Sequence, residues 1–395
     1  MAKLIDITGR VLSGEWGTDD ELGNGIPVIR TTNFTNEGVI NYNNVVTRRI
    51  TKKNIDEKYL CNGDIIIEKS GGSDKFPVGR VVYFDGNENT YLFNNFTGVL
   101  RVKNQNIWYP KYVFYSLFAN YKRGGTRTFE NKTTGLHNLK TDYYVSQYEI
   151  AEKDKKEQIL ICEKLDRLYG VIELREREVK LLDDLIKARF VELFGDPVIN
   201  PYGYDKVALS DLADIKIGPF GSLLHKHDYI ENGHPLINPS HIIDGNILPD
   251  DKLSISDEKY NELSSYQLKI DDVVMGRRGE MGRCAIVKKE GFLCGTGSLL
   301  IRTKGEVKSD YIQKIISFPS FKKTIEDIAV GQTMPNLNVP IVSSFQIIKP
   351  PMEVQDSYYN FVKQVDKSKV VYMYILKIRK YLMYNSKYRE KVNCI

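Results

Sequence analysis

The two halves of this 395-residue chain carry the same series of short segments in the same order, and this internal repeat limits the fold more than any other feature. Residues 14–17 (Gly-Glu-Trp-Gly) match residues 218–221 (Gly-Pro-Phe-Gly), and the apolar run at 26–29 matches that at 234–237. Further matches join 63–67 to 271–275, 78–80 to 281–283, 97–98 to 296–297 and 138–139 to 336–337. Such a repeat indicates two copies of one domain.

A segment with a helical pattern follows each copy. In residues 153–196 the apolar positions recur at steps of four and three, which is the spacing of a coiled-coil seam, at Ile161, Leu165, Leu168, Ile172, Val179, Leu182, Ile186 and Leu193. Residues 353–395 repeat the pattern at Tyr358, Phe361, Val365, Ser368, Tyr372, Ile375 and Leu382. We expect the two helices to pack together as an antiparallel coiled coil. The alternative is that each apolar stripe docks on its own globular domain.

The globular segments have mainly the pattern of short strands. Runs such as 64–68 and 298–302 are rich in β-branched and aliphatic residues and are bounded by Gly, Asn or Asp. We therefore predict an α+β fold with two repeated domains joined by long helices. The predicted parts are a first domain at 1–152, a central helix at 153–196, a second domain at 197–352, and a C-terminal helix and tail at 353–395.

The net charge is compatible with a nucleic-acid partner, but it is too small to indicate one by itself. Lys and Arg number 56 and Asp and Glu 51, and the net charge of +5 lies mainly in residues 353–395, which hold nine basic and four acidic residues. The globular domains are close to neutral, so DNA binding requires basic side chains gathered on one face. No apolar stretch is long enough for a membrane span, and five scattered cysteines fit a reducing compartment. We expect a cytoplasmic protein with no membrane partner.

Catalytic and metal-binding motifs are incomplete. Residues 237–240 (Ile-Asn-Pro-Ser) show only part of the Asn-Pro-Pro-aromatic motif of amino-methyltransferases, and no glycine-rich cofactor loop follows a strand. Acidic-lysine groups at 56–58 and 257–259 are commoner as surface turns than as nuclease sites. Four histidines and two cysteines match no familiar ligand spacing: His225, His227, His234, His241, Cys284 and Cys294. We predict no catalytic residue and no metal site in this chain.

Polar, glycine-bearing loops follow corresponding strands in the two copies. The loop at 30–33 corresponds to 238–241, and the loop at 69–75 corresponds to 276–280. Their residue types are those that read base edges and hold phosphates. Because the strands repeat while the loops differ, the copies are typical of two readers of different sequences. The candidate DNA-contacting residues are Arg30, Asn33, Lys69, Lys75, Arg127 and Lys132 in the first copy and Asn238, His241, Arg277, Arg278, Gln332 and Thr333 in the second.

With its repeat and heptads, the chain resembles the specificity subunits of type I restriction-modification systems. Gly-Gln-Thr-Met-Pro-Asn-Leu at 331–337 and Glu-Leu-Phe-Gly-Asp at 192–196 support the resemblance. It implies a non-catalytic subunit whose two target-recognition domains each read one half of a bipartite site in double-stranded DNA, while the helices set the spacer.

The resemblance also implies partners and their cofactors. Modification subunits would clasp the helices and carry S-adenosylmethionine, and restriction subunits would use ATP and Mg²⁺, with no cofactor in this chain. The helix residues assigned to the coiled coil and its partners are Leu165, Leu168, Ile172, Val179, Leu182, Ile186, Phe361, Val365, Tyr372 and Ile375. Two alternatives remain: a coiled-coil scaffold with two domains for ligands other than DNA, and a nuclease or methyltransferase with a disguised active site.

Overall fold

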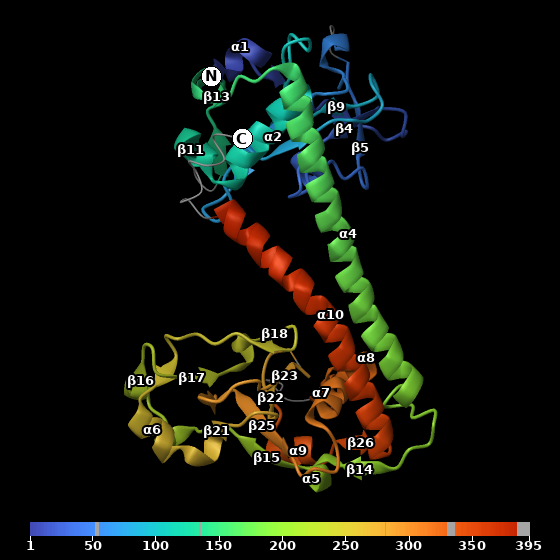
Figure 1. Ribbon diagram of the computed structural model, residues 1–395, viewed down its shortest axis with the longest axis vertical. Coiled ribbons are helices and arrows are strands. Elements are labelled where there is room, and N and C mark those ends of the chain that lie inside the picture. Colours follow the sequence, from blue (N-terminus) through green and yellow to red (C-terminus); the bar gives the residue numbers. More distant parts are fainter. Residues whose placement is uncertain (52–54, 134–135, 281, 330–335, 385–395) are drawn as a thin grey trace. The chain divides into compact units, whose positions relative to one another are not determined.

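The computed structural model describes residues 1–51, 55–133, 136–280, 282–329 and 336–384, and for residues 132, 133, 329 and 370–384 only the main chain is described. The chain forms two compact units (Figure 1). The first unit comprises Met1–Arg177 and Met373–Ile395, and the second comprises Glu178–Tyr372. One helix, α4 (Lys155–Phe194), contributes its first half to the first unit and its second half to the second.

Before α4, the described residues of the first unit form short strands and three helices. The helices are α1 (Leu4–Thr8), α2 (Pro110–Lys122) and α3 (Thr141–Gln147). The strands are β1 (Ala2–Lys3), β2 (Leu12–Ser13), β3 (Thr18–Asp19), β4 (Ile26–Ile29), β5 (Val46–Arg49), β6 (Ile65–Glu68), β7 (Ser70–Gly72), β8 (Val81–Tyr83), β9 (Leu92–Phe93), β10 (Thr97–Leu100), β11 (Glu130–Thr133), β12 (Leu136–Leu139) and β13 (Glu149–Ile150). They form sheets in the orders β2-β10-β6-β8, β3-β5-β4-β9, β11-β12-β7 and β1-β13.

The second unit repeats this plan. Its helices are α5 (Leu209–Leu212), α6 (Asp257–Glu262), α7 (Ser309–Ser317), α8 (Pro319–Ala329), α9 (Val339–Ser343) and α10 (Met352–Tyr384), which continues into the first unit. The strands are β14 (Lys206–Ala208), β15 (Ala213–Ile217), β16 (Tyr229–Ile230), β17 (His234–Ile237), β18 (Ile242–Ile243), β19 (Asn246–Ile247), β20 (Ser254–Ile255), β21 (Gln267–Leu268), β22 (Val273–Gly276), β23 (Cys284–Ile286), β24 (Phe292–Cys294), β25 (Ser298–Thr303) and β26 (Gln346–Ile348). Their sheets run β15-β25-β22-β23, β16-β20-β17-β24-β21, β18-β19 and β14-β26.

The two units share strand order as well as sequence pattern. The sheet β2-β10-β6-β8 corresponds to β15-β25-β22-β23, and β3-β5-β4-β9 corresponds to the first four strands of β16-β20-β17-β24-β21. In both units the apolar strand expected from the repeat pairs in parallel, β4 with β9 and β17 with β24. The first and last strands of each unit also pair, β1 with β13 and β14 with β26. The predicted duplication is therefore present in the hydrogen-bonding of the sheets.

The sheet register corrects one sequence match. Thr97 pairs with Glu68, and Ser298 pairs with Gly276. Glu68 and Gly276 are the last residues of the corresponding strands β6 and β22. Thr97 therefore corresponds to Ser298, and the match of 97–98 with 296–297 is two residues out.

Each unit has a central strand that is buried on both faces. Ile65 and Ile67 of β6 pack in one apolar cluster with α2, whereas Ile66 packs in a second cluster with β4 and β9. In the second unit Val273 and Met275 face the cluster that contains α7, and Val274 faces the other side. Double-sided burial explains the uninterrupted apolar runs of these strands.

An ion pair between a buried aspartate and a partly exposed arginine links the second and third strands of each main sheet at their ends. Arg101 donates to both carboxylate oxygens of Asp64, at 2.8 and 2.7 Å, and Arg302 does the same to Asp272, at 2.7 and 2.6 Å. Both aspartate side chains are almost completely buried. Each also accepts a main-chain N–H, from Cys61 or Lys269. Two-pronged guanidinium-carboxylate pairing is strong and directional, so it fixes the strand spacing in both units.

A buried glutamine anchors the start of each long helix. Gln158 of α4 accepts the N–H of Tyr109, which precedes α2, and Gln355 of α10 accepts the N–H of Lys308, which precedes α7. Each amide group also donates to a carbonyl just before its own helix, at Lys153 or Pro350. The long helices are thus bonded to equivalent points on the two units.

In the second unit α4 and α10 pack antiparallel, as the heptads predict. Phe194 lies 5.4 Å from Tyr358 between ring centroids, and Lys369 Nζ lies 2.6 Å from the Asp183 carboxylate, so residue numbers fall on one helix as they rise on the other. Phe194 also contacts Tyr311 of α7. The seam residue Ile186 lies in the same apolar cluster as Ile312 of α7 and Val365 of α10. The apolar stripe of α4 therefore meets both the other helix and the globular domain, which combines the two arrangements that the sequence left open.

In the first unit α4 docks on α2. Lys111 Nζ lies 2.8 Å from the Asp166 carboxylate, to which the Tyr115 hydroxyl also donates, and Tyr115 stacks on Tyr169 at 5.9 Å between centroids. The seam residues differ in exposure: Ile172 is buried, and Leu168 is 55% exposed. The side chains of Tyr372 and Ile375 lie outside the described part of the structure.

Within the described part of the chain, no helix is both long and apolar enough to cross a lipid bilayer.

Candidate nucleic-acid interface

The first element of the candidate interface is a short 3₁₀ turn after the repeated parallel strand. It is η1 (Thr31–Asn33) in the first unit and η6 (Pro239–His241) in the second. The side chain of Asn33 accepts the main-chain N–H of Arg30 at 3.0 Å. At the matching place, His241 Nδ1 lies 3.3 Å from the Asn238 nitrogen and 2.9 Å from the Leu236 carbonyl oxygen.

These bonds separate the predicted residues of the turn into two groups. Asn33 and His241 are buried, and their side chains are bonded to the main chain of Asn41 and Leu236. Arg30 and Asn238 are half-buried, and each stands one residue before its turn. The buried pair therefore shapes the turn, whereas Arg30 and Asn238 lie at its edge.

A second pair of candidates, Lys69 and Arg277, makes the same two main-chain hydrogen bonds in the two units, and we call this pattern the main-chain frame. The Lys69 N–H donates to the Phe96 carbonyl at 2.8 Å, and the Lys69 carbonyl accepts the N–H of Leu139. Arg277 has the same two bonds, to Gly297 at 3.0 Å and from Leu337. Lys69 and Arg277 thus occupy equivalent positions, with different cationic side chains on the same frame.

In the second unit the structure brings several candidates together. The Asn238 side-chain oxygen lies 3.3 Å from the Gly297 nitrogen, whose residue also bonds Arg277. Arg277 Nε donates to the Asn336 side chain at 2.9 Å, and Arg278 beside it is exposed. Burial, together with the like charge of Arg278, lowers the pKa of Arg277. Gln332 and Thr333 lie outside the described residues.

In the first unit the candidates fall in two groups. Arg127, in the turn η3 (Gly125–Phe129), donates to the carbonyl groups of Asp74 and Lys75 at 3.1 and 3.2 Å, which ties that turn to the loop after β7. Lys75 is exposed there. Lys69 is half-buried, and this burial lowers the pKa of its ammonium group. Lys132 lies on β11, but its side chain is outside the description.

Arg30 belongs to a small aromatic-cation cluster. Its guanidinium lies 6.0 Å from the ring centre of Trp16, and that of Arg48 lies 4.2 Å from the same ring. Arg30 also donates to the Asn44 carbonyl at 3.3 Å. Trp16 and Arg48 are not among the predicted residues, although the tryptophan stands in the first repeated segment, so the sequence did contain a signal for it.

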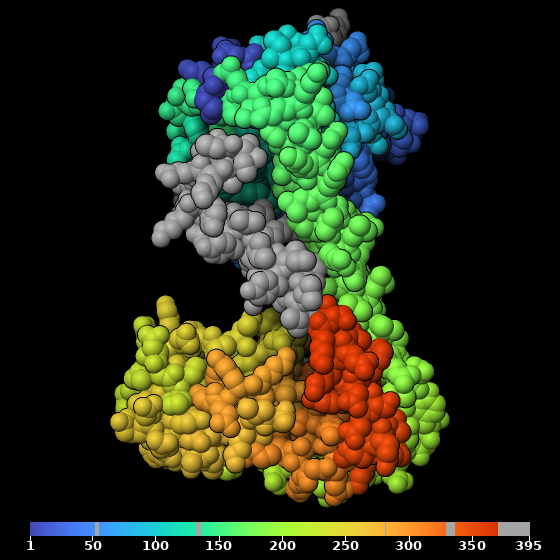
Figure 2. All heavy atoms as spheres, in the orientation of Figure 1, coloured from blue at the N-terminus to red at the C-terminus, as the bar shows by residue number. Residues whose placement is uncertain are grey.

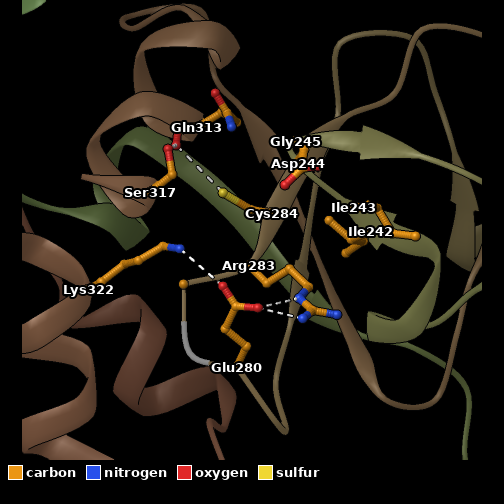
Figure 3. Close-up of a pocket in the computed structure, with 11 residues that line it drawn as sticks. Ile242, Ile243, Asp244, Gly245, Glu280, Arg283, Cys284, Gln313, Ser317 and Lys322 are labelled. Atoms are coloured by element: carbon orange, nitrogen blue, oxygen red, sulfur yellow. Dashed lines mark hydrogen bonds and ion pairs between the residues drawn. The ribbon is translucent and has the colours of Figure 1, made fainter. Parts of the chain in front are cut away.

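Arg80 and Arg283 are the clearest omission from the predicted residues. Both directly precede a strand of the main sheet, and both donate to the carbonyl group of the first residue of the 3₁₀ turn, Thr31 at 2.9 Å and Pro239 at 3.2 Å. The match of 78–80 with 281–283 aligns the two arginines in the sequence. Figure 3 shows Arg283 beside a pocket of about 190 Å³, with Glu280 and Lys322 also on its lining.

The histidines form other contacts instead of a metal cluster. His234 stacks on Tyr260 at 3.7 Å and lies 3.0 Å from the Asp257 carboxylate, and His225 stacks on His227. In the part of the chain that the structure describes, no group of three or more His, Cys, Asp or Glu side chains is arranged to hold a metal ion.

Two turns and two frames of the same design, bearing unlike polar and basic side chains, define a pair of related recognition domains. A comparison with family models matches residues 2–182 and 201–371 to the type I restriction modification DNA specificity domain. The chain belongs to this family, as its predicted resemblance indicated. It is a non-catalytic DNA sequence-specificity subunit with two recognition domains.

Solved structures of this family share the fold. The S subunit of a type I restriction-modification system from M. genitalium matches with a TM-score of 0.59 and 15% identity, over 97% of this chain and 93% of that one. A second structure, from work on complex assembly and conformational transition of the type I R-M system, matches with a TM-score of 0.57 and 14% identity, over 97% and 93%. The predicted α+β class with two repeated domains is confirmed by these matches.

Proposed function

We propose that each recognition domain reads one half of a bipartite, asymmetric site in double-stranded DNA, mainly through the major groove. One observation carries this proposal: equivalent main-chain frames bear Lys69 in one domain and Arg277 in the other, and equivalent turn edges bear Arg30 and Asn238. Arg prefers guanine edges and Asn prefers adenine edges in the major groove. Unlike side chains on one scaffold therefore select unlike base sequences.

The proposed DNA-contacting set keeps every candidate except Asn33 and His241 as a direct contact. Asn33 and His241 act in this proposal through the turns that they hold, because their polar atoms face the main chain. The remaining members are Arg30, Lys69, Lys75, Arg127, Lys132, Asn238, Arg277, Arg278, Gln332 and Thr333. Phosphate contacts from the lysines would position the duplex, and the turns would read its bases.

Partner subunits complete the proposed activity. One face of α4 carries exposed apolar side chains at helical spacing, Val171, Leu174, Leu181 and Leu185, each about half exposed or more. Figure 2 shows α4 as a green band at the surface. An exposed apolar stripe on a long helix is a suitable surface for helices of a partner. We assign it to modification subunits that carry S-adenosylmethionine, joined in a cytoplasmic complex by restriction subunits that use ATP and Mg²⁺.

Methylome sequencing tests the proposal directly. Cells that express the chain with its modification subunits should methylate a split motif with two defined halves and a spacer of fixed length. Cells without the gene for this chain should lack methylation at that motif while other methylated motifs persist. A continuous motif, or no motif that depends on the gene, would contradict the proposed function.

Shortening α4 should change the spacer. The helix of 40 residues spans about 60 Å, and removal of residues 174–180 would shorten it by about 10 Å, or about three base pairs of DNA. We expect the preferred spacer to change by about three base pairs, with both half-site sequences retained. The control replaces residues 174–180 with a heptad of the same pattern and length. An unchanged spacer in the deletion variant, read by methylome sequencing, would refute the role of α4 as a ruler.

A further inference from the structure

The two recognition domains share an arginine whose guanidinium donates to a main-chain carbonyl group of the 3₁₀ turn. In the first domain the Arg80 guanidinium donates to the carbonyl groups of Thr31 at 2.9 Å and Phe34 at 3.1 Å, which are at the two ends of η1. In the second domain the Arg283 guanidinium donates to the Pro239 carbonyl at 3.2 Å, at the start of η6. The bond to the first residue of the turn recurs in both copies.

A carboxylate also bonds each guanidinium, but it comes from a different segment of the chain in each domain. Glu68, the last residue of β6, is buried and lies 3.4 Å from Arg80 Nη2. Position 276 in β22 is the counterpart of Glu68 and is a glycine, and here the carboxylate comes from Glu280 in the following loop. Glu280 accepts Arg283 Nε at 3.1 Å and Lys322 Nζ at 3.4 Å from α8, as Figure 3 shows.

The arginine and its bond to the turn are present in both domains, whereas the carboxylate that orients the arginine comes from different segments. The bond between arginine and turn is therefore the shared feature. Hydrogen bonds from Arg283 and Lys322 lower the pKa of Glu280, so this carboxylate stays ionised and keeps the guanidinium in place. In Glu68 burial outweighs the attraction of Arg80 and raises the pKa.

The position of the turn decides where the base-reading side chains lie. Hydrogen bonds to base edges weaken steeply when donor and acceptor move out of line or beyond about 3.2 Å. Arg30 and Asn238 stand at the edge of η1 and η6, so a shift of a turn carries its reader away from the base edge. A planar guanidinium can bond a carbonyl and a carboxylate at once in fixed directions, which a lysine ammonium does much less rigidly.

We propose that Arg80 and Arg283 are equivalent positioning residues that set the base selectivity of the first and second recognition domains. Each guanidinium bonds a carbonyl group of the turn and a carboxylate, and in this way it holds η1 or η6 in place. This inference rests on the proposed reading of one half-site by each domain. It assigns the two arginines no contact with bases, and each acts on one half-site alone.

The test uses Arg283→Lys and Arg80→Lys in the full chain, assembled with its modification subunits. The probes are DNA duplexes that carry the methylated motif, with single base-pair changes in one half-site or the other. For Arg283→Lys we expect discrimination among bases at the second half-site to fall about tenfold, which corresponds to about 1.4 kcal/mol. Discrimination at the first half-site should stay unchanged, and Arg80→Lys should give the mirror result.

Salt dependence separates positioning from a phosphate contact. A residue that neutralises one phosphate changes the slope of log K against log salt by about 0.9 when its charge is removed. We therefore expect Arg283→Gln to lose base discrimination as Arg283→Lys does, with the slope unchanged. A slope reduced by about 0.9 with discrimination retained would overturn the proposal and identify Arg283 as a phosphate contact.

Further controls keep the proposal testable if a variant folds poorly. Glu280→Gln removes the exposed carboxylate without touching the turn, and it should broaden base preference at the second half-site alone. Equal loss at both half-sites, or unaltered discrimination in folded variants, would overturn the positioning role. If the unmodified complex itself shows no split motif, the proposed function fails instead. Arg10→Lys, at an exposed arginine outside the turns, serves as the matched control and should behave as the unmodified chain.

Discussion

Replacement of Arg302 by methionine is expected to lower the free energy of unfolding of the second recognition domain by about 2–3 kcal/mol. The Asp272 side chain is 2% exposed and loses both guanidinium bonds in this variant. The N–H of Lys269 still bonds the carboxylate, but it cannot replace a cation. A buried carboxylate without its counter-charge is strongly destabilising, and the partial exposure of Arg302 moderates the effect.

Denaturant unfolding followed by hydrogen exchange can report this loss for each domain separately. Amides of β22 and β25 should exchange faster in Arg302→Met, while those of β6 and β10 keep their protection. Arg101→Met, which removes the partner of Asp64, is the matched control and should reverse the pattern. Arg302→Met combined with Asp272→Asn should recover part of the stability, because no charge is left buried. A loss below about 0.5 kcal/mol in the single variant would show that the pair contributes little.

Arg277→Ala with Arg278→Ala is expected to weaken recognition of the second half-site by at least tenfold and leave the first half-site unchanged. One good two-pronged contact of an arginine with a guanine contributes about 1–3 kcal/mol of discrimination. The main chain of Arg277 bonds Gly297 and Leu337, so Arg277 occupies the position that Lys69 has in the first domain. The variant removes two cations from one domain and none from the other.

Competition binding of the assembled complex against half-site duplexes measures the effect. Lys226→Ala with Lys252→Ala removes two exposed charges from the same domain outside the candidate loops, and it controls for loss of general electrostatic attraction. We expect that control to keep its half-site preference. Equal weakening of both half-sites by the arginine pair would count against separate readers.

The repeat and the heptads were sufficient to predict the architecture. The apolar runs at 26–29 and 234–237 form β4 and β17, and the predicted helix at 153–196 is found as Lys155–Phe194. The register error at Thr97 has a plain cause. A Thr-Gly pair occurs in both copies, but strand register is set by cross-strand hydrogen bonds that residue identity does not reveal.

The site was less predictable because a polar loop side chain can either contact DNA or form hydrogen bonds within its own turn. Asn33 and His241 are polar loop residues, and both make hydrogen bonds to the main chain in or beside the turn, a role common for such side chains. Arg80 and Arg283 were visible as an aligned pair, but an arginine next to a strand gives no sign of which carbonyl it will contact. Only the folded chain brings Thr31 and Pro239 to them.

The pairing of the first and last strands in each domain has a consequence for how genes of this family can recombine. Ala2 pairs with Ile150, and Lys206 pairs with Ile348, so each domain begins and ends at one joint beside its long helix. A gene segment that encodes everything between these strands can be exchanged by recombination without disturbing the other domain. If each domain reads one half-site as proposed, single exchanges between related genes give new combinations of half-sites without stepwise mutation of the loops.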